Sequence, residues 1–280
     1  MTGLSRAIGH FLLHARRAAN ACDYVITSLT ALLGKTWSYC QRRGFWSTFE
    51  RALTVLLRKD AYKNYIRRAR RVGASKIFVG IYEQNIWRNN ESVSGHGSTL
   101  EYTKGLRESL PSIFDALQIK SVVDAPCGDF NWMRQVPMEG MRYFGIDIVP
   151  GLIEDNKQKF STPDISFICA DISNATFPDA DLFFCRDCLF HLSFEDIRGV
   201  LTSFCKSNLK YLMTTTHMVP YRFSNYDIAT GDFRVIDLFK PPFSFPEDVL
   251  FRVEDYRPPD LPREMCVWSA EQVCKSRLFS

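Results

Sequence analysis

The spacing of hydrophobic and polar positions divides the chain into a helical first part and a regular strand–helix series. From about residue 4 to residue 33, hydrophobic residues recur every three or four positions, and a second such pattern runs from 49 to 72. This spacing gathers hydrophobic side chains on one face, so it predicts amphipathic helices. It also predicts a helix over 103–117, with a break near 109–111 because Pro111 lacks an N–H donor.

From residue 121 onward, short hydrophobic runs alternate with amphipathic stretches. They predict strands at 121–125, 142–147, 165–169, 181–186, 210–216 and near 265–268, and helices at about 129–136, 151–160 and 194–205. Ser193, with Asp196 three residues later, is typical of a helix start. Strands that alternate with helices predict right-handed crossovers. The expected fold is therefore α/β: a Rossmann-like, mostly parallel sheet with helices on both faces, preceded by a helical extension.

Two segments interrupt this pattern. Residues 73–100 are rich in glycine, serine and asparagine, which predicts a linker that closes into a structured loop. Residues 218–264 are rich in Phe, Pro and Tyr and are too long for a plain connection, so they predict a lid or hairpin over the carboxyl ends of the strands. The expected organisation is a basic helical extension at 1–76 and one domain at 77–280 that contains this insertion.

The net charge of +4 conceals an uneven distribution. Residues 1–76 hold 15 Lys and Arg against 3 acidic residues, whereas the remainder holds 20 against 28. Such a basic segment suits a peripheral membrane surface, an acidic protein or nucleic acid. Solvated helices whose cations lie near their carboxyl ends would explain the same arginines without a partner. The pattern leaves both interpretations open.

Nine cysteines at irregular positions, without a secretory signal, indicate neither a disulfide framework nor an extracellular protein. A cytoplasmic location is expected. No run approaches the roughly 18 hydrophobic residues of a membrane span, so any membrane contact is expected to be peripheral. Cys185 and Cys188 form a C-x-x-C pair without a second pair at zinc spacing, which favours buried thiols and no metal site.

Acidic residues stand at the ends of the first three predicted strands. Asp124, Asp147 and Asp171 each follow a hydrophobic run, and parallel sheets bind ligands at the carboxyl ends of their strands. Gly128 allows a close approach of backbone to a ligand. An acid at the tip of the second strand can accept hydrogen bonds from both hydroxyls of a ribose, and Asp171 lies where an exocyclic amine could be bound.

These motifs, over 121–216 and the last strand, resemble class I S-adenosylmethionine-dependent methyltransferases. The family's first motif usually has three glycines, whereas here Pro126 and Phe130 replace two of them and only Gly128 matches. That departure disfavours a pyrophosphate, which needs those glycines. The resemblance implies S-adenosyl-L-methionine as cofactor, held by Asp124, Pro126, Gly128, Trp132, Asp147, Ile148, Asp171, Ile172 and Arg186.

The loop SVSGHGST at 92–99 precedes the first motif. Together with an upstream Trp it resembles an element of bacterial methyltransferases of the polysaccharide-biosynthesis type. That resemblance implies that Ser94, Gly95 and Ser98 bind the methionine carboxylate of the cofactor. A simple turn and N-cap for the following helix is the alternative.

The stretch CRDCLFHLSFEDI at 185–197 is the expected catalytic segment, because it follows the fourth strand beside the position of the methyl group. Methyl transfer to a hydroxyl requires a positioned acceptor and removal of its proton. We expect His191 to act as base and Asp187 to orient it, with Arg186 and His217 at the same edge. A histidine that bonds backbone in a tight loop is the alternative.

The insertion offers polar side chains for the acceptor: Asn225, Asp227 and Arg234. Their mixture with aromatic residues suits a hydroxyl-rich acceptor such as a sugar, although a purely structural role is open. The favoured function is O-methylation of a small or glycan acceptor. The alternatives are a non-catalytic binding protein that docks through its basic segment, and a nucleic-acid or protein methyltransferase. The motifs of nucleic-acid enzymes are absent after the fourth strand, so nucleic acid is disfavoured. The acceptor atom, the oligomeric state, any metal requirement and the role of residues 1–76 do not follow from the sequence.

Overall fold

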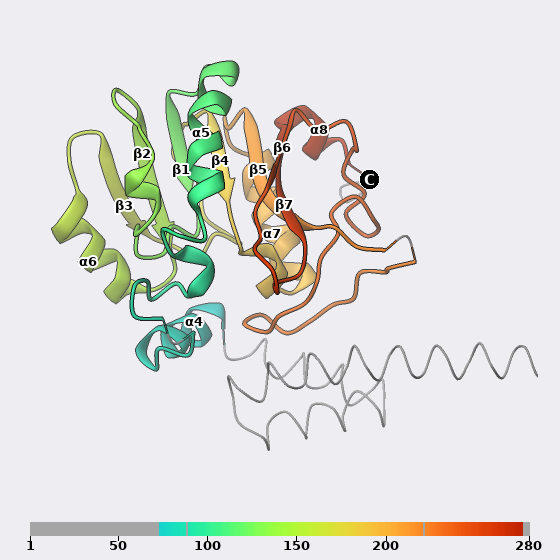
Figure 1. Ribbon diagram of the computed structural model, residues 1–280, viewed down its shortest axis with the longest axis horizontal. Helices are drawn as coiled ribbons and strands as arrows, with labels where there is room; N and C mark the ends of the chain where they lie inside the picture. Colours follow the sequence, from blue (N-terminus) through green and yellow to red (C-terminus); the bar gives the residue numbers. More distant parts are fainter. Residues whose placement is uncertain (1–72, 88, 221, 277–280) are drawn as a thin grey trace, which may run out of the picture. The chain divides into compact units, whose positions relative to one another are not determined.

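A seven-stranded sheet organises the part of the chain that the computed structural model describes, residues 73–87, 89–220 and 222–276 (Figure 1). Its strands lie in the order β3-β2-β1-β4-β5-β7-β6. β7 runs antiparallel to β5 and β6, and the other neighbours are parallel. The strands are β1 (Ser121–Asp124), β2 (Arg142–Asp147), β3 (Ile165–Cys169), β4 (Leu182–Cys185), β5 (Tyr211–His217), β6 (Phe251–Glu254) and β7 (Arg263–Ser269). The predicted α/β fold with a mostly parallel sheet is confirmed.

Helices cover both faces of this sheet. They are α4 (Ala74–Glu83), α5 (Lys104–Leu117), α6 (Pro150–Phe160), α7 (Phe194–Cys205) and α8 (Ala270–Cys274), with short 3-10 turns η1 (His96–Ser98), η2 (Met133–Gln135) and η3 (Leu189–His191). Successive strand residues point to opposite faces. Accordingly, Val122 belongs to the hydrophobic cluster of Leu110 on α5, and Val123 to that of Leu201 on α7.

Three local predictions are wrong. Residues 129–136 form only the short turn η2, and the first part of the predicted linker is helix α4. Helix α5 continues through Pro111 without a break. A proline inside a helix costs about 3 kcal/mol, and α5 buries Leu106, Leu110, Ile113 and Phe114, each of which contributes about 1.5–3 kcal/mol. Burial therefore outweighs the missing hydrogen bond.

The insertion at 218–264 is a packed segment. Ile228, Ile236, Leu238 and Phe243 are fully buried, and all but Ile228 belong to the cluster that contains α7. Its end forms strand β6, which the sequence pattern did not predict and which pairs with β7. The insertion supplies none of the residues that line the cavity described below. In this structure the described residues of the insertion do not reach the cavity, and a role as a lid stays a prediction.

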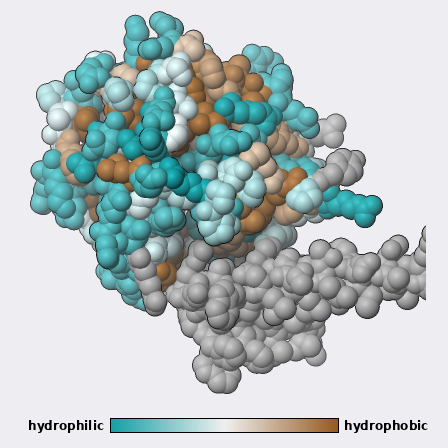
Figure 2. Space-filling view, in the orientation of Figure 1, coloured by the Kyte–Doolittle hydropathy of each residue, from teal (hydrophilic) through white to brown (hydrophobic). Residues whose placement is uncertain are grey.

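The predicted basic extension at 1–76 lies outside the described residues except for 73–76, where α4 begins. The chain divides into the units Met1–Asn64 and Tyr65–Ser280, and every described residue belongs to the second. On the face shown in Figure 2, hydrophilic side chains predominate and hydrophobic ones show between them. In the described part of the chain, no helix is long and hydrophobic enough to cross a membrane.

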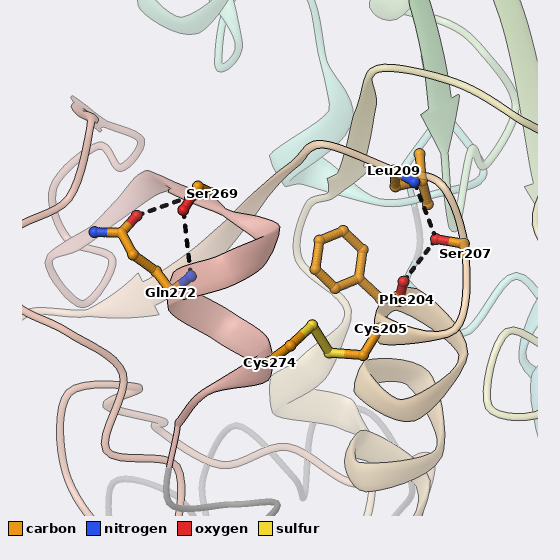
Figure 3. Close-up of a disulfide and its surroundings, with 7 residues drawn as sticks. All are labelled: Phe204, Cys205, Ser207, Leu209, Ser269, Gln272 and Cys274. Carbon is orange, nitrogen blue, oxygen red and sulfur yellow. Dashed lines mark hydrogen bonds between the residues drawn. A yellow bond between two sulfur atoms is a disulfide. The ribbon is translucent and has the colours of Figure 1, made fainter.

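A disulfide joins the end of α7 to α8 (Figure 3). Cys205 and Cys274 have Cα atoms 5.7 Å apart and are separated by 69 positions in the sequence. Beside the bridge, α8 begins with a capping box in which Ser269 and Gln272 bond each other's backbone N–H groups. The expectation of no disulfide is therefore wrong for this pair. The cytoplasmic location stays a prediction.

Loss of this bridge is expected to lower the free energy of unfolding by about 2–4 kcal/mol, because the disulfide restricts a long loop of the unfolded chain. Urea unfolding of wild type and the Cys205→Ser/Cys274→Ser variant measures the change. The matched control is Cys169→Ser, which removes an exposed free thiol and should change the free energy by less than about 0.5 kcal/mol. Equal midpoints for wild type with and without reductant would contradict the prediction.

Candidate functional site

A cavity lies at the carboxyl ends of β1, β2, β3 and β4, with α4 contributing to its wall. It brings together most of the side chains that the sequence analysis proposed. Those that line it are Ser94, Ser98, Asp124, Pro126, Gly128, Trp132, Asp147, Ile148, Asp171, Ile172, Arg186, Asp187 and His191. Gly95 is the one predicted cofactor residue outside this lining. A Cβ on Gly95 would lie 3.2 Å from the Cβ of Trp87, so Gly95 packs against that ring instead.

The turn after β1 requires a glycine at position 128. Gly128 has a φ of 56°, and a Cβ there would lie 2.2 Å from the Oγ of Ser94. The Ser94 hydroxyl accepts a hydrogen bond from the backbone N–H of Asp129 at 3.2 Å. The carboxylate of Asp129 in turn accepts from the N–H of Val93 at 2.9 Å. The loop at 92–98 is thus tied to this turn. Its role toward the methionine carboxylate stays a prediction.

Two buried carboxylates occupy the ends of β1 and β2. Burial raises the pKa of Asp124 to about 7, although Tyr143 donates a hydrogen bond to it at 2.6 Å. Burial likewise raises the pKa of Asp147 to about 6, while hydrogen bonds from the N–H groups of Val149 and Gly128 act in the opposite direction. Each carboxylate oxygen of Asp147 retains a second lone pair. Asp147 can therefore accept from two adjacent hydroxyls of a ligand.

A network of arginines and acids adjoins the cavity, to whose lining Arg186 and Asp187 belong. Arg186, immediately after β4, donates two hydrogen bonds to Asp255 at 2.7 and 3.0 Å. Arg263, at the start of β7, donates two to Asp187 at 3.0 and 3.1 Å. Burial acts to raise the pKa of Asp187, but the charges of Arg186 and Arg263 hold it below the usual value. Asp187 is therefore an ionised partner of arginine and is poorly suited to take a proton.

His191 ends the turn η3 and reaches the cavity. Its Nδ1 lies 2.8 Å from the backbone carbonyl oxygen of Asp232. A carbonyl only accepts hydrogen bonds, so Nδ1 carries the proton and the neutral ring has its lone pair on Nε2. The expected orienting partner, Asp187, instead bonds Arg263. The backbone of Asp232 is the contact that the structure gives the ring, and the orienting role of Asp187 stays a prediction.

The remaining predicted residues have structural partners. His217 is buried outside the cavity lining, where its Nδ1 accepts from the N–H of Ile236 at 3.3 Å. Burial and the charge of Arg263 lower the pKa of His217 to about 4. Asn225 bonds the backbone of the insertion. Asp227 and Arg234 bond the backbone at 189–194. The structure does not bring these four residues to the cavity, because backbone groups use their polar atoms.

Other lining and network residues were missed by the sequence analysis. Trp87, Phe78 and Tyr82 line the cavity from a stretch that was interpreted as a linker. Helical spacing of Phe78 and Tyr82 was the signal that could have placed them on one face. Arg263 starts the last strand, and because β7 is antiparallel its first residue lies at the ligand edge, opposite His217. The direction of that strand was the missing information.

The charges of the cavity suit a cationic ligand. Among the described residues, its Asp, Glu, His, Lys and Arg lining consists of one histidine, His191, one arginine, Arg186, and six carboxylates: Asp124, Asp129, Asp147, Asp171, Asp187 and Asp196. Such a lining repels a pyrophosphate and attracts a sulfonium and an ammonium. The aromatic and aliphatic part of the lining suits an adenine ring. The residues present therefore fit S-adenosylmethionine and not a dinucleotide.

The binding of a cationic ligand is expected to depend on pH through Asp124. The ionised fraction of a group with a pKa of about 7 rises from about one tenth at pH 6 to about nine tenths at pH 8. Since a cation stabilises the ionised form, its affinity should rise with pH, by up to about tenfold over this range. Titration calorimetry at both pH values measures the change. The control is Asp124→Asn, in which this part of the pH dependence should be lost; an equal slope in both proteins would contradict the prediction.

Comparisons with known proteins agree with this geometry. Residues 122–208 match the family model described as a methyltransferase domain. No curated protein sequence matches the chain. Solved structures to which the chain is similar include magnesium protoporphyrin IX methyltransferase from Synechocystis PCC 6803 (12% identity, TM-score 0.46, 70% of this chain and 96% of that chain covered) and an N-methyltransferase from Bradyrhizobium japonicum WM9 (13%, 0.47, 60% and 96%). A third is human N-acetylserotonin methyltransferase (16%, 0.43, 75% and 67%).

Likenesses at these identities say nothing about the acceptor. The strand order, the acidic cavity at the strand ends and the domain match at 122–208 converge. Residues 122–208 therefore match a methyltransferase domain, and the lining of the cavity fits S-adenosylmethionine as its cofactor.

Proposed function

We propose that the protein transfers a methyl group to a hydroxyl oxygen of a small or sugar-like acceptor, with His191 as general base. The observation that carries this proposal is the contact of His191 Nδ1 with the carbonyl of Asp232 at 2.8 Å. That contact places the proton of the ring on Nδ1 and leaves the basic lone pair on Nε2, and the ring lines the cavity. A hydroxyl needs such a base because its proton must leave as the new bond forms.

When bound, S-adenosylmethionine would supply an electrophilic methyl carbon to the acceptor oxygen and leave as the neutral thioether. His191 receives the hydroxyl proton on Nε2. The resulting imidazolium is stabilised by the Asp232 carbonyl. It is also stabilised by the negative charge of Asp187, which interacts electrostatically with the His191 ring. Val93, Ser94, Ser98 and Trp132 line the same cavity, where they would shield the reacting atoms from water.

The polar groups around His191 support a neutral, hydroxyl-bearing acceptor. Arg186 is neutralised by Asp255, and Arg263 by Asp187, so the network leaves little charge for an anionic acceptor. Trp87 lies beside His191, with ring centroids 6.2 Å apart, and offers a hydrophobic face. Ser98 lines the same cavity and can bond a hydroxyl. This combination fits a ring that has both C–H and O–H groups, as sugars do.

Incubation with isotope-labelled S-adenosylmethionine and a panel of acceptors tests the proposal. The panel should contain glycans and small phenols as hydroxyl acceptors, primary amines of matched size, and a nucleic acid. We expect methyl ethers, identified by mass spectrometry, from one of the hydroxyl acceptors. Methylation of amines or nucleic acid alone would overturn the choice of oxygen, and binding of the cofactor without any transfer would favour a non-catalytic binding protein.

A further inference from the structure

The insertion at 218–264 makes a dense set of contacts with the loop that carries His191. We name residues 189–194 the base loop and residues 227–234 the clamp segment. The two are more than 30 positions apart in the sequence, yet hydrogen bonds join them along the whole base loop. None of these contacts was expected from the sequence.

The centre of the clamp segment holds His191 itself. The N–H of Gly231 donates to the backbone carbonyl of His191 at 2.8 Å, and the carbonyl of Asp232 accepts from Nδ1 of the ring at 2.8 Å. Gly231 has a φ of 91°, a conformation that glycine adopts without strain. The chain therefore turns at Gly231 so that consecutive residues contact the backbone and the ring of the same histidine.

Arg234 binds the base loop on both sides of His191. Its guanidinium donates to the carbonyl of Leu192 at 2.6 Å and to that of Leu189 at 3.3 Å, and its N–H donates to the carbonyl of Phe190 at 3.1 Å. Its charge lies 4.9 Å from the ring centre of Phe194. Arg234 is fully buried. A buried arginine that bonds main-chain carbonyls fixes the path of the loop, because each unmade bond would leave a buried polar group unsatisfied.

The beginning of the clamp segment holds the other end of the base loop. The hydroxyl of Thr230 accepts from the N–H of Ser193 at 2.9 Å, and the carboxylate of Asp227 accepts from the N–H of Phe194 at 2.7 Å. These N–H groups belong to the first turn of α7, where intrahelical partners are lacking. The clamp segment therefore fixes both the helix start and the loop before it.

We propose that the clamp segment is a positioning element for His191, which holds the base loop so that the ring keeps its proton on Nδ1 and presents Nε2 to the acceptor. In water a histidine ring exchanges between two neutral tautomers, and the partner of one nitrogen decides which form is present. The clamp supplies that partner from a backbone carbonyl whose position depends on Gly231, Thr230 and Arg234. This inference rests on the proposed role of His191 as base.

Nitrogen-15 NMR of the histidine rings in the full chain tests the inference without any acceptor. The His191 signals are assigned by their absence in His191→Gln. Wild type should show a protonated Nδ1 and an unprotonated Nε2. Arg234→Met and Thr230→Val, which act on opposite ends of the base loop, should shift the signals toward a mixture of tautomers. Arg234→Lys, which keeps one donor group, should fall between wild type and Arg234→Met.

The matched control is Phe245→Leu, which weakens the packing of the same insertion against Trp268, away from the base loop. It should lower the melting temperature and leave the tautomer unchanged.

Kinetics with an acceptor that the wild type methylates gives a second readout. The kcat of Arg234→Met and Thr230→Val should fall by about tenfold to a hundredfold, at unchanged affinity for S-adenosylmethionine. Folded variants that keep the wild-type tautomer would overturn the inference. If wild type transfers no methyl group, the proposed function fails, while the NMR result still decides the clamp.

Discussion

Replacement of His191 by glutamine is expected to lower kcat by a factor of about 10²–10⁴, the usual contribution of a positioned general base. Glutamine keeps a similar length and can donate to the carbonyl of Asp232, but it has no basic nitrogen for the hydroxyl proton. The affinity for S-adenosylmethionine should be unchanged, because the cofactor contacts expected at Asp147 and Gly128 lie elsewhere in the cavity.

Steady-state kinetics with a hydroxyl acceptor that the wild type methylates measures this change. Titration calorimetry with S-adenosylmethionine shows whether the cofactor site of the variant is intact. Asp187→Asn provides a contrast. It should weaken the contact with Arg263 and lower the stability, without removing the base. A variant His191→Gln that retains kcat within about threefold would remove His191 from the mechanism, because a general base contributes far more than that.

Replacement of Arg186 by methionine is expected to lower the free energy of unfolding by about 3–5 kcal/mol, because it leaves the buried carboxylate of Asp255 without its partner. Both side chains are almost completely inaccessible, at 4% and 1% exposure. The guanidinium also lies 5.4 Å from the ring centre of Trp132, so its removal loosens the cavity wall. Cofactor binding should weaken in the same variant.

Urea unfolding at equilibrium measures the effect, and a double variant supplies the control. Arg186→Met combined with Asp255→Leu removes both charges, and it should recover much of the loss. For comparison, the ion pair of Lys159 and Asp155 on α6 is exposed. Its removal should change the free energy of unfolding by about 0.5 kcal/mol or less. A loss below about 1 kcal/mol in Arg186→Met would show that Asp255 has another partner.

Six of the seven described strands and the helices α5, α6 and α7 could be predicted from the sequence because their hydrophobic patterns are local, although the break expected in α5 is absent. The predicted strand at 165–169 and helix at 194–205 have the bounds of β3 and α7. Elements whose stability depends on distant partners were missed. The strand β6 forms because β7 is there to pair with it, and the bridge of Cys205 to Cys274 joins positions that no spacing relates.

The donor side of the site was more predictable than the acceptor side for a physical reason. Parallel strands bring their carboxyl ends to one edge, so Asp124, Asp147 and Asp171 had to converge once the strands were placed. Whether a polar side chain of an irregular segment faces a ligand or a backbone carbonyl is decided by tertiary packing. For that reason Arg234 was assigned to the acceptor, whereas it bonds the carbonyls of the base loop.

Titration calorimetry of the full chain with S-adenosylmethionine tests the central claim, that the acidic cavity at the strand ends is the cofactor site. Wild type should bind one molecule, and Asp147→Ala should bind at least about tenfold more weakly, since hydrogen bonds to a carboxylate are lost. Asp155→Ala, on the exposed face of α6, should bind as wild type does. Absence of binding by wild type, or equal affinity in Asp147→Ala, would contradict the account.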